Sequence, residues 1–159
     1  MIDPEQFRRL VVQPTLHRMG MWSQAAENLL VGTAVKESGL RALEQEGGPA
    51  LGVYQVEPAS HADLFVNWYA KKWVPKSYDR SLITDLAYAT IIARLIYYRR
   101  PEPLPAADDI DGLAASWKQH YNTPPGKGTP SPWSLVYREH CRCGVFHFGW
   151  RFGWRPWPL

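Results

Sequence analysis

Residues 35–58 read VKESGLRALEQEGGPALGVYQVEP, and they carry the clearest signals of fold and function in the chain. Upstream of them, Ser23 precedes apolar residues that recur at helical spacing, namely Leu29, Leu30, Val31, Ala34 and Val35. Ser38 and Gly39 mark the end of that run, because glycine is common just past the end of a helix. The pattern therefore predicts a buried helix with Glu37 in its last turn.

A carboxyl group at the end of a buried helix is suited to acid catalysis. Partial burial disfavours its charged form, and the negative end of the helix dipole acts in the same direction. Glu37 is therefore expected to stay protonated near neutral pH, as a general acid must. A glycosidic oxygen needs such a proton in order to leave. The alternative is that Glu37 is an ordinary exposed acid at a helix end.

Two motifs in this stretch resemble the signature of soluble lytic transglycosylases. In that family Glu-Ser is followed by Gly-Leu-Met-Gln and then by a proline. This chain has Glu37 and Ser38, then Gly-Val-Tyr-Gln at residues 52–55, then Pro58. The spacing between the glutamate and the glutamine also resembles that of the family.

A third motif of the family, an Ala-Tyr-Asn-x-Gly turn, is matched in part by Tyr121 and Asn122. His120 stands where the family has alanine, and the close glycine is absent. The whole similarity spans roughly residues 20–137 and is to phage-borne members of the lysozyme-like superfamily. The structural alternative is that Tyr121 and Asn122 simply end a helix, where asparagine is common.

The resemblance implies a mainly α, lysozyme-like α+β fold with a short β-hairpin beside the cleft, and an enzyme that needs no cofactor. Glu37 would protonate the oxygen between N-acetylmuramic acid and N-acetylglucosamine in peptidoglycan. It would then accept the proton of the muramic 6-hydroxyl as a 1,6-anhydro ring closes. Tyr121 would support Glu37, and the substrate-binding residues would be Ser38, Tyr54, Gln55, Tyr121 and Asn122.

Two other functions are compatible with the same residues. An inverting hydrolase would need a second carboxylate to activate water, and Glu44, Glu46 and Glu57 are the nearby candidates. A virion structural or ejection protein could instead retain a lysozyme-like fold with little or no turnover, since a fold does not fix an activity.

Length and composition predict one globular domain, residues 1–141, followed by an aromatic and basic extension, residues 142–159. A chain of 159 residues buries about two thirds of its unfolded surface. Apolar residues make up 45% of it and aromatic residues 13%, which is typical of a folded protein rather than a disordered one.

Outside the motif region the chain reads mostly as helices. Asp3 and Pro4 predict a helix start, and Pro14 predicts a restart. Further helices are expected from Pro58, over residues 81–99 as the central core helix, over residues 110–120 after the cap Asp109, and from residue 131. Residues 52–56 are expected to be extended or hairpin-like and to border the cleft.

The extension, residues 142–159, contains all of the net charge of +3, through Arg142, Arg151 and Arg155. From residue 145 aromatic residues alternate with small or basic ones, which is the period of a strand. Such an aromatic face is expected to pack on its own domain or on a neighbouring virion protein. The alternative is contact with lipid headgroups or glycan. The basic excess is too small to indicate a nucleic-acid partner.

Cys141 and Cys143 are too close in sequence for an unstrained disulfide, so both are expected to be thiols. His140, Cys141, Cys143 and His147 do not follow a common zinc pattern, and no metal is expected. The start of the chain lacks a signal-peptide pattern, and no segment approaches the roughly 20 apolar residues of a membrane span. These features favour phage cargo, located in the virion or in the host cytoplasm before release, that acts in the periplasm or cell wall of the host.

Overall fold

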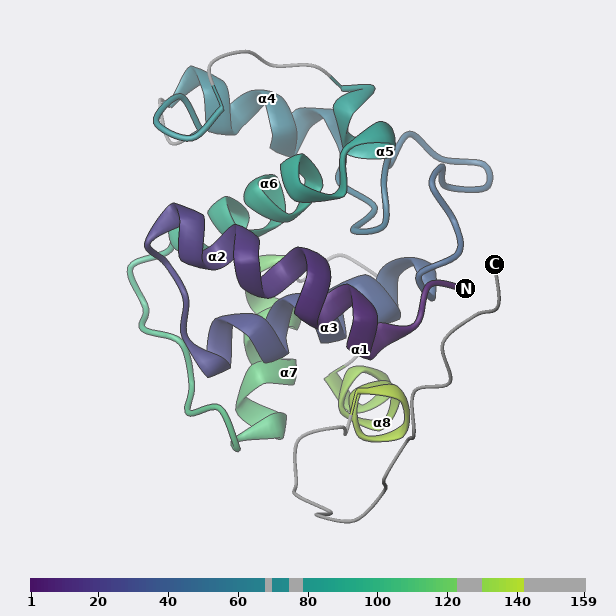
Figure 1. Ribbon diagram of the computed structural model, residues 1–159, viewed down its shortest axis with the longest axis vertical. Coiled ribbons are helices and arrows are strands. Elements are labelled where there is room, and N and C mark those ends of the chain that lie inside the picture. Colours follow the sequence, from purple (N-terminus) through teal and green to yellow (C-terminus); the bar gives the residue numbers. More distant parts are fainter. Residues whose placement is uncertain (68–69, 75–78, 123–129, 142–159) are drawn as a thin grey trace, which may run out of the picture.

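The computed structural model describes residues 1–67, 70–74, 79–122 and 130–141, and this part of the chain is mainly helical (Figure 1). The mainly α prediction is therefore confirmed, and these residues contain no strand. The helical elements are α1 (Pro4–Phe7), the π-helical turn η1 (Arg8–Val12), α2 (Gln13–Met19), α3 (Gln24–Ser38), α4 (Pro58–Val66), α5 (Ser81–Thr84), α6 (Leu86–Tyr98), α7 (Ile110–His120) and α8 (Pro130–His140).

Both ends of α3 lie where the sequence pattern predicts them. The Ser23 hydroxyl accepts a hydrogen bond from the backbone N–H of Ala26 at 3.1 Å, and Gly39 ends the helix with a φ of 60°. Every residue from 26 to 35 is buried, so α3 is enclosed on all sides and not along one stripe only. Its last turn, which carries Glu37, is only half-buried and lies at the edge of the core.

The N-terminal helices form one continuous helical path and not two separate helices. Asp3 caps α1 by accepting the N–H of Gln6 at 2.8 Å, as predicted. The helix expected to restart at Pro14 is present as α2, which begins at Gln13 and ends at Met19, although α1, η1 and α2 follow one another without a break. A proline inside a helix removes one hydrogen bond and needs room for its ring, and the wider π turn ends at Val12, two residues before Pro14.

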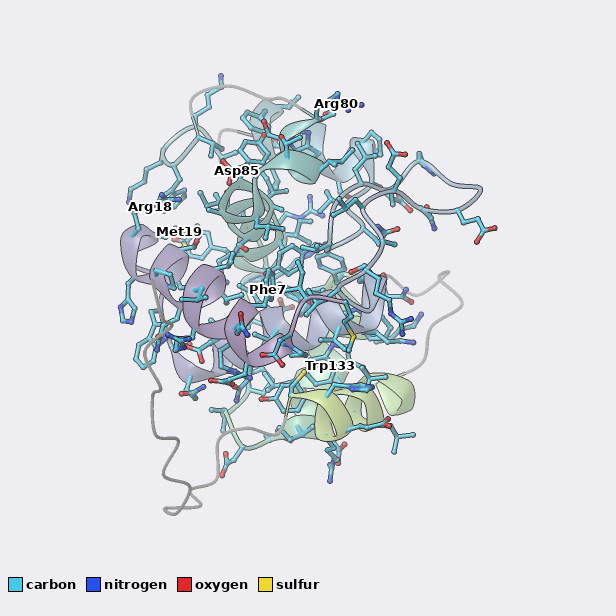
Figure 2. The ribbon with its side chains drawn as sticks, turned by 45° about the vertical axis from the view of Figure 1, so that its right-hand side comes forward. Phe7, Arg18, Met19, Arg80, Asp85 and Trp133 are labelled. Carbon is cyan, nitrogen blue, oxygen red and sulfur yellow. The ribbon has the colours of Figure 1, made fainter. Side chains whose placement is uncertain are left out.

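The helix expected over residues 81–99 is divided at Asp85. This residue has an extended backbone, φ −130° and ψ 101°, and its carboxylate accepts the N–H of Tyr88 at 2.9 Å. Figure 2 shows Asp85 at the junction of the two helices. Hydrophobic periodicity continues across the break, so only the cap separates α5 from α6. The longer part, α6, is buried at nine of its positions and belongs to the core as predicted.

The helices pack around α3. In Figure 1, α4 and α5 lie beside α6 on one side of it, and α7 and α8 lie on the other. The approach of α8 to α3 depends on Gly32, because a Cβ there would lie 2.2 Å from Cζ2 of Trp133. Figure 2 shows Trp133 on the side of α8 that faces the core. Trp133 is fully buried and stacks on Tyr137.

A buried polar cluster joins the N-terminal helices to α3. The Arg8 guanidinium donates to Glu27 and to Asn28, each at 2.8 Å, and burial leaves these side chains less than a tenth exposed. The Trp22 indole donates to the other oxygen of Glu27 at 2.8 Å. Because the charged groups of Arg8 and Glu27 are paired with each other, we interpret the cluster as structural and not as a binding site.

The connection from α3 to α4, residues 39–57, approaches a hairpin only through isolated bridges. Leu51 pairs with Glu44 and with Val56, and the expected β-hairpin is not confirmed within the described residues. Gly52 and Gln55 have φ values of 75° and 48°, so the backbone turns where a strand would extend. The connection projects beside the end of α3 (Figure 1).

Predictions for the C-terminal part are tested only as far as residue 141. Asp109 caps α7 by accepting the N–H of Gly112 at 2.8 Å, and α8 begins close to the predicted position. Cys141 is buried. Cys143, His147 and the whole extension, residues 142–159, lie outside the described residues. In the described ranges no three His, Cys, Asp or Glu side chains are arranged to hold a metal ion, and no helix there could span a membrane.

Candidate functional site

A polar pocket of about 180 Å³ lies where the end of α3, the 39–57 connection, α6 and the end of α7 meet. Four of the predicted site residues line it, namely Glu37, Gln55, Tyr121 and Asn122. These residues are far apart in sequence, so the fold brings the three motifs to one place. Other lining residues are Gln45, Glu57, Ser60, Arg99 and His120.

Glu37 is held at the wall of this pocket by a tryptophan. The indole N–H of Trp117, on α7, donates to Oε1 of Glu37 at 2.7 Å. Trp117 is only 1% exposed, so its ring has little freedom to move. The Lys36 ammonium lies over the same ring, 5.9 Å from its centre.

Burial raises the pKa of Glu37, in the direction expected from its position at the end of α3. The hydrogen bond from Trp117 and the positive charge of Lys36 oppose this rise without cancelling it. A carboxyl group whose pKa is raised keeps its proton to higher pH than an exposed glutamic acid does. This shift is in the direction that a general acid requires.

Two tyrosines, the buried Tyr97 and the half-buried Tyr121, interact electrostatically with Glu37. The rings of Tyr97 and Tyr121 stack with centres 5.4 Å apart, and the Tyr97 hydroxyl is 2.8 Å from that of Thr33. Burial, together with the negative charge of Glu37, raises the pKa of Tyr97 and of Tyr121 well above the ordinary value. Both phenols therefore stay neutral and provide no acid or base near neutral pH.

The hydroxyl of Tyr121 contacts the loop of residues 52–55 and does not contact the Glu37 carboxyl. That hydroxyl donates to the backbone carbonyl of Tyr54 at 2.7 Å, across a sequence separation of 67 residues. The resemblance implies that Tyr121 supports Glu37. The described residues show no hydrogen bond from Tyr121 to Glu37, so this role stays a prediction.

The conformation of the loop of residues 52–55 depends on Gly52. Its φ is 75°, and a Cβ at this position would lie 2.1 Å from the backbone oxygen of Leu82. Gln55 hydrogen-bonds to Gly52, because its backbone N–H and its Nε2 donate to the Gly52 carbonyl at 2.9 and 2.8 Å. Gln55 therefore lines the pocket in a conformation fixed by its own loop.

Two of the predicted substrate-binding residues do not line the pocket. Ser38 lies behind the wall, where its hydroxyl is 2.7 Å from the carbonyl of Val53 and accepts the N–H of Leu40 at 3.1 Å. Tyr54 is fully buried, and its hydroxyl is 3.2 Å from that of Thr90. Both side chains hold the loop against the helices.

Of the three acids considered as a second carboxylate, only Glu57 lines the pocket. Glu44 and Glu46 are exposed and lie elsewhere in the 39–57 connection. Glu57 is also exposed. The pocket therefore contains one half-buried carboxyl and one solvated carboxyl, which is an unequal pair.

Sequence reasoning did not assign three residues of the site. Trp117 lies one helical turn before Tyr121, and this i, i+4 spacing was a usable signal. Arg99 lines the pocket from the end of α6 and forms an ion pair with Asp63. His120 also lines it, and burial is the main cause that lowers its pKa, although Glu102, 3.9 Å away, acts in the opposite direction.

The raised pKa of Glu37 predicts that Glu37→Gln stabilises the protein at neutral pH. In the wild type, the stabilising contribution of the protonated carboxyl is complete below the pKa of the unfolded chain. It is lost as the pH rises through the higher pKa of the folded state. Glutamine carries no charge and can still accept the indole N–H. In thermal unfolding measured from pH 4 to pH 8, the melting temperature of the variant should increase relative to that of the wild type as the pH rises. A difference in melting temperature that does not change with pH would contradict the prediction.

Comparison of the chain with models of protein families, with curated proteins and with solved structures finds no match in any of the three.

Proposed function

We propose that this protein is a lytic transglycosylase with a lysozyme-like fold, which cleaves the β-1,4 bond between N-acetylmuramic acid and N-acetylglucosamine in peptidoglycan. The observation that carries the proposal is the half-buried Glu37 carboxyl, with a raised pKa, at the wall of a polar pocket. Gln55, Tyr121 and Asn122, which belong to the motifs of the resemblance, line the same pocket.

The proposed reaction uses Glu37 twice. The protonated carboxyl first gives its proton to the glycosidic oxygen, and the acetamido group of the substrate stabilises the charge at the anomeric carbon. The carboxylate then accepts the proton of the muramic 6-hydroxyl, whose oxygen closes the 1,6-anhydro ring. A single carboxyl that changes its protonation state is enough, which agrees with the unequal environments of Glu37 and Glu57.

The finer description of the fold is also part of the proposal. The bridges from Leu51 to Glu44 and to Val56 would be a reduced form of the β-hairpin that borders the cleft in lysozyme-like proteins. Gln55 and Asn122 would bind the sugar amides and hydroxyls, while Ser38 and Tyr54 would keep the loop in position.

A peptidoglycan hydrolase is the second candidate, and one observation favours it. Glu57 lines the same pocket as Glu37 and is solvated, so it could hold a water molecule as a general base. In that case the product would carry a reducing end and not an anhydro ring.

The proposed setting is a phage virion that opens the host cell wall locally during infection, with peptidoglycan glycan strands as the main partner. The extension, residues 142–159, would contact other virion proteins or a membrane surface. These proposals rest on the resemblance and on composition, because the extension is outside the described residues.

Mass spectrometry of the fragments that the purified protein releases from peptidoglycan tests the function. We expect 1,6-anhydro-muropeptides from the wild type. Reducing-end muropeptides that disappear with Glu57→Gln would instead establish the hydrolase. A folded protein that releases neither product would refute both enzymes and favour a structural protein of the virion.

A further inference from the structure

We propose that Trp117 is a positioning residue for the reaction, whose indole N–H fixes Oε1 of Glu37 so that Oε2 faces the scissile bond. This inference rests on the proposed function and adds a residue that the resemblance does not include. Among the described residues, the indole N–H is the one hydrogen-bond donor to the Glu37 carboxyl, at 2.7 Å. The bond joins α3 to α7 across 80 residues of sequence.

The chemistry of an indole suits this role. Its N–H can donate a hydrogen bond but cannot accept one, and it neither gives nor takes a proton near neutral pH. Trp117 can therefore orient the carboxyl without competing for the catalytic proton. Because Oε1 accepts the indole N–H, the proton of the neutral acid is left on Oε2. That oxygen is then available to the glycosidic oxygen and, later, to the 6-hydroxyl.

The indole has little freedom to move. Trp117 is 1% exposed, and it lies one turn before Tyr121, whose ring stacks on Tyr97 and whose hydroxyl bonds to Tyr54. The donor is thus held in place by packing, whereas a glutamate side chain alone has several rotatable bonds. Fixing one oxygen removes most of that freedom, and a displacement of about 1 Å in a reacting group can cost on the order of 100-fold in rate.

The same bond affects the pH range of activity. Burial raises the pKa of Glu37, and the indole and the Lys36 ammonium, on the same helix, both lower it. The two tyrosines that interact electrostatically with it, Tyr97 and Tyr121, are neutral. The other charged or titratable groups of the pocket are Glu57, Arg99 and His120. Removing only the indole bond should therefore raise the pKa of Glu37 further and move the alkaline limb of the pH–rate profile to higher pH.

Trp117→Phe tests this role, because phenylalanine keeps an aromatic ring and removes the donor. We expect kcat to fall by about 10-fold to 100-fold while KM changes less than about twofold, since the bond positions the acid and does not bind substrate. We also expect the alkaline limb to move to higher pH. An unchanged limb and an unchanged kcat in a folded variant would overturn the proposal.

Trp133→Phe is the matched control. Trp133 is as buried as Trp117, and its indole nitrogen is buried with no hydrogen-bond partner among the described residues. Both substitutions therefore remove the same atoms from the core, but only Trp117→Phe removes a bond to Glu37. We expect the control to lose stability and to keep the wild-type pH limb. A shift of the limb in both variants would mean that core damage is the cause, and it would overturn the proposal.

A nuclear magnetic resonance titration of the wild type separates this inference from the proposed function. As Glu37 ionises, the indole N–H resonance of Trp117 should shift with the same midpoint as the Glu37 carboxyl carbon, and Glu37→Gln should abolish that shift. This measurement needs no substrate and no core substitution. An indole resonance that does not follow Glu37 would overturn the positioning role, whereas a protein that titrates as expected but releases no muropeptide would refute only the proposed function.

Discussion

Glu37→Gln should abolish the release of muropeptides while the protein stays folded. Glutamine has nearly the same shape and can accept the indole N–H of Trp117, but it cannot give a proton to the glycosidic oxygen. General acid catalysis by one side chain contributes roughly 10²–10⁴-fold in rate, and here the same group also acts as the base. We therefore expect a loss at or above the upper end of that range, measured as the rate of soluble fragment release from purified peptidoglycan.

Glu57→Gln provides the control for this result. Glu57 lines the same pocket but is exposed, so its substitution removes a negative charge from the pocket without removing the buried acid. A lytic transglycosylase should retain most of its rate in this variant. If Glu37→Gln turned over at a rate close to that of the wild type, Glu37 would not be the acid and the proposed function would be wrong.

Gly52→Ala should both destabilise the fold and impair the site. A Cβ at Gly52 would lie 2.1 Å from the backbone oxygen of Leu82, which cannot rotate away as a side chain could. Overpacking of this kind costs about 1–3 kcal/mol, and a positive φ adds about 1 kcal/mol for a residue with a side chain. We expect the free energy of unfolding to fall by on the order of 3 kcal/mol, measured by urea denaturation at pH 7.

The effect of Gly52→Ala on the site follows from the hydrogen bonds of the loop. The Gly52 carbonyl accepts from Gln55, and its N–H donates to Leu43 at 2.8 Å. A backbone shift at Gly52 therefore displaces Gln55 from the pocket wall. The rate of fragment release should therefore fall even at a temperature where the variant is fully folded.

Gly47→Ala separates the clash from the backbone strain. Gly47 has a φ of 69°, close to that of Gly52, but a Cβ there would meet nothing within 4 Å. It lies in the same connection and is exposed. This variant should lose only about 1 kcal/mol and keep its activity. An equal loss of unfolding free energy in both variants would show that the contact with Leu82 does not contribute to the destabilisation.

Local signals in the sequence predicted most of the helices of this protein. Ser23 and Gly39 bound α3, Asp3 caps α1 and Asp109 caps α7, because a capping side chain acts on backbone groups within a few residues of itself. The position of Glu37 in the last turn of a buried helix also follows from spacing alone. The same local reasoning missed the break at Asp85, since hydrophobic periodicity runs through it without interruption.

The candidate site was only partly predictable. The motifs predicted that Glu37, Gln55, Tyr121 and Asn122 belong together, and these four side chains line one pocket. The motifs did not show which residues touch substrate and which hold the loop. Ser38 and Tyr54 turned out to lie behind the pocket wall, because their hydroxyl groups are used within the protein.

By itself, then, the sequence determined the helices with local caps, the mainly helical class and the placement of one carboxyl at a helix end. Only the tertiary structure decided that Trp117 bonds to Glu37, that Tyr121 bonds to the Tyr54 carbonyl, and that Gly52 meets Leu82. The physical reason is that caps and periodicity act over a few residues along the chain. These contacts join residues up to 80 positions apart, and they exist only once the packing of α3, α5, α7 and the 39–57 connection has set the distances between them.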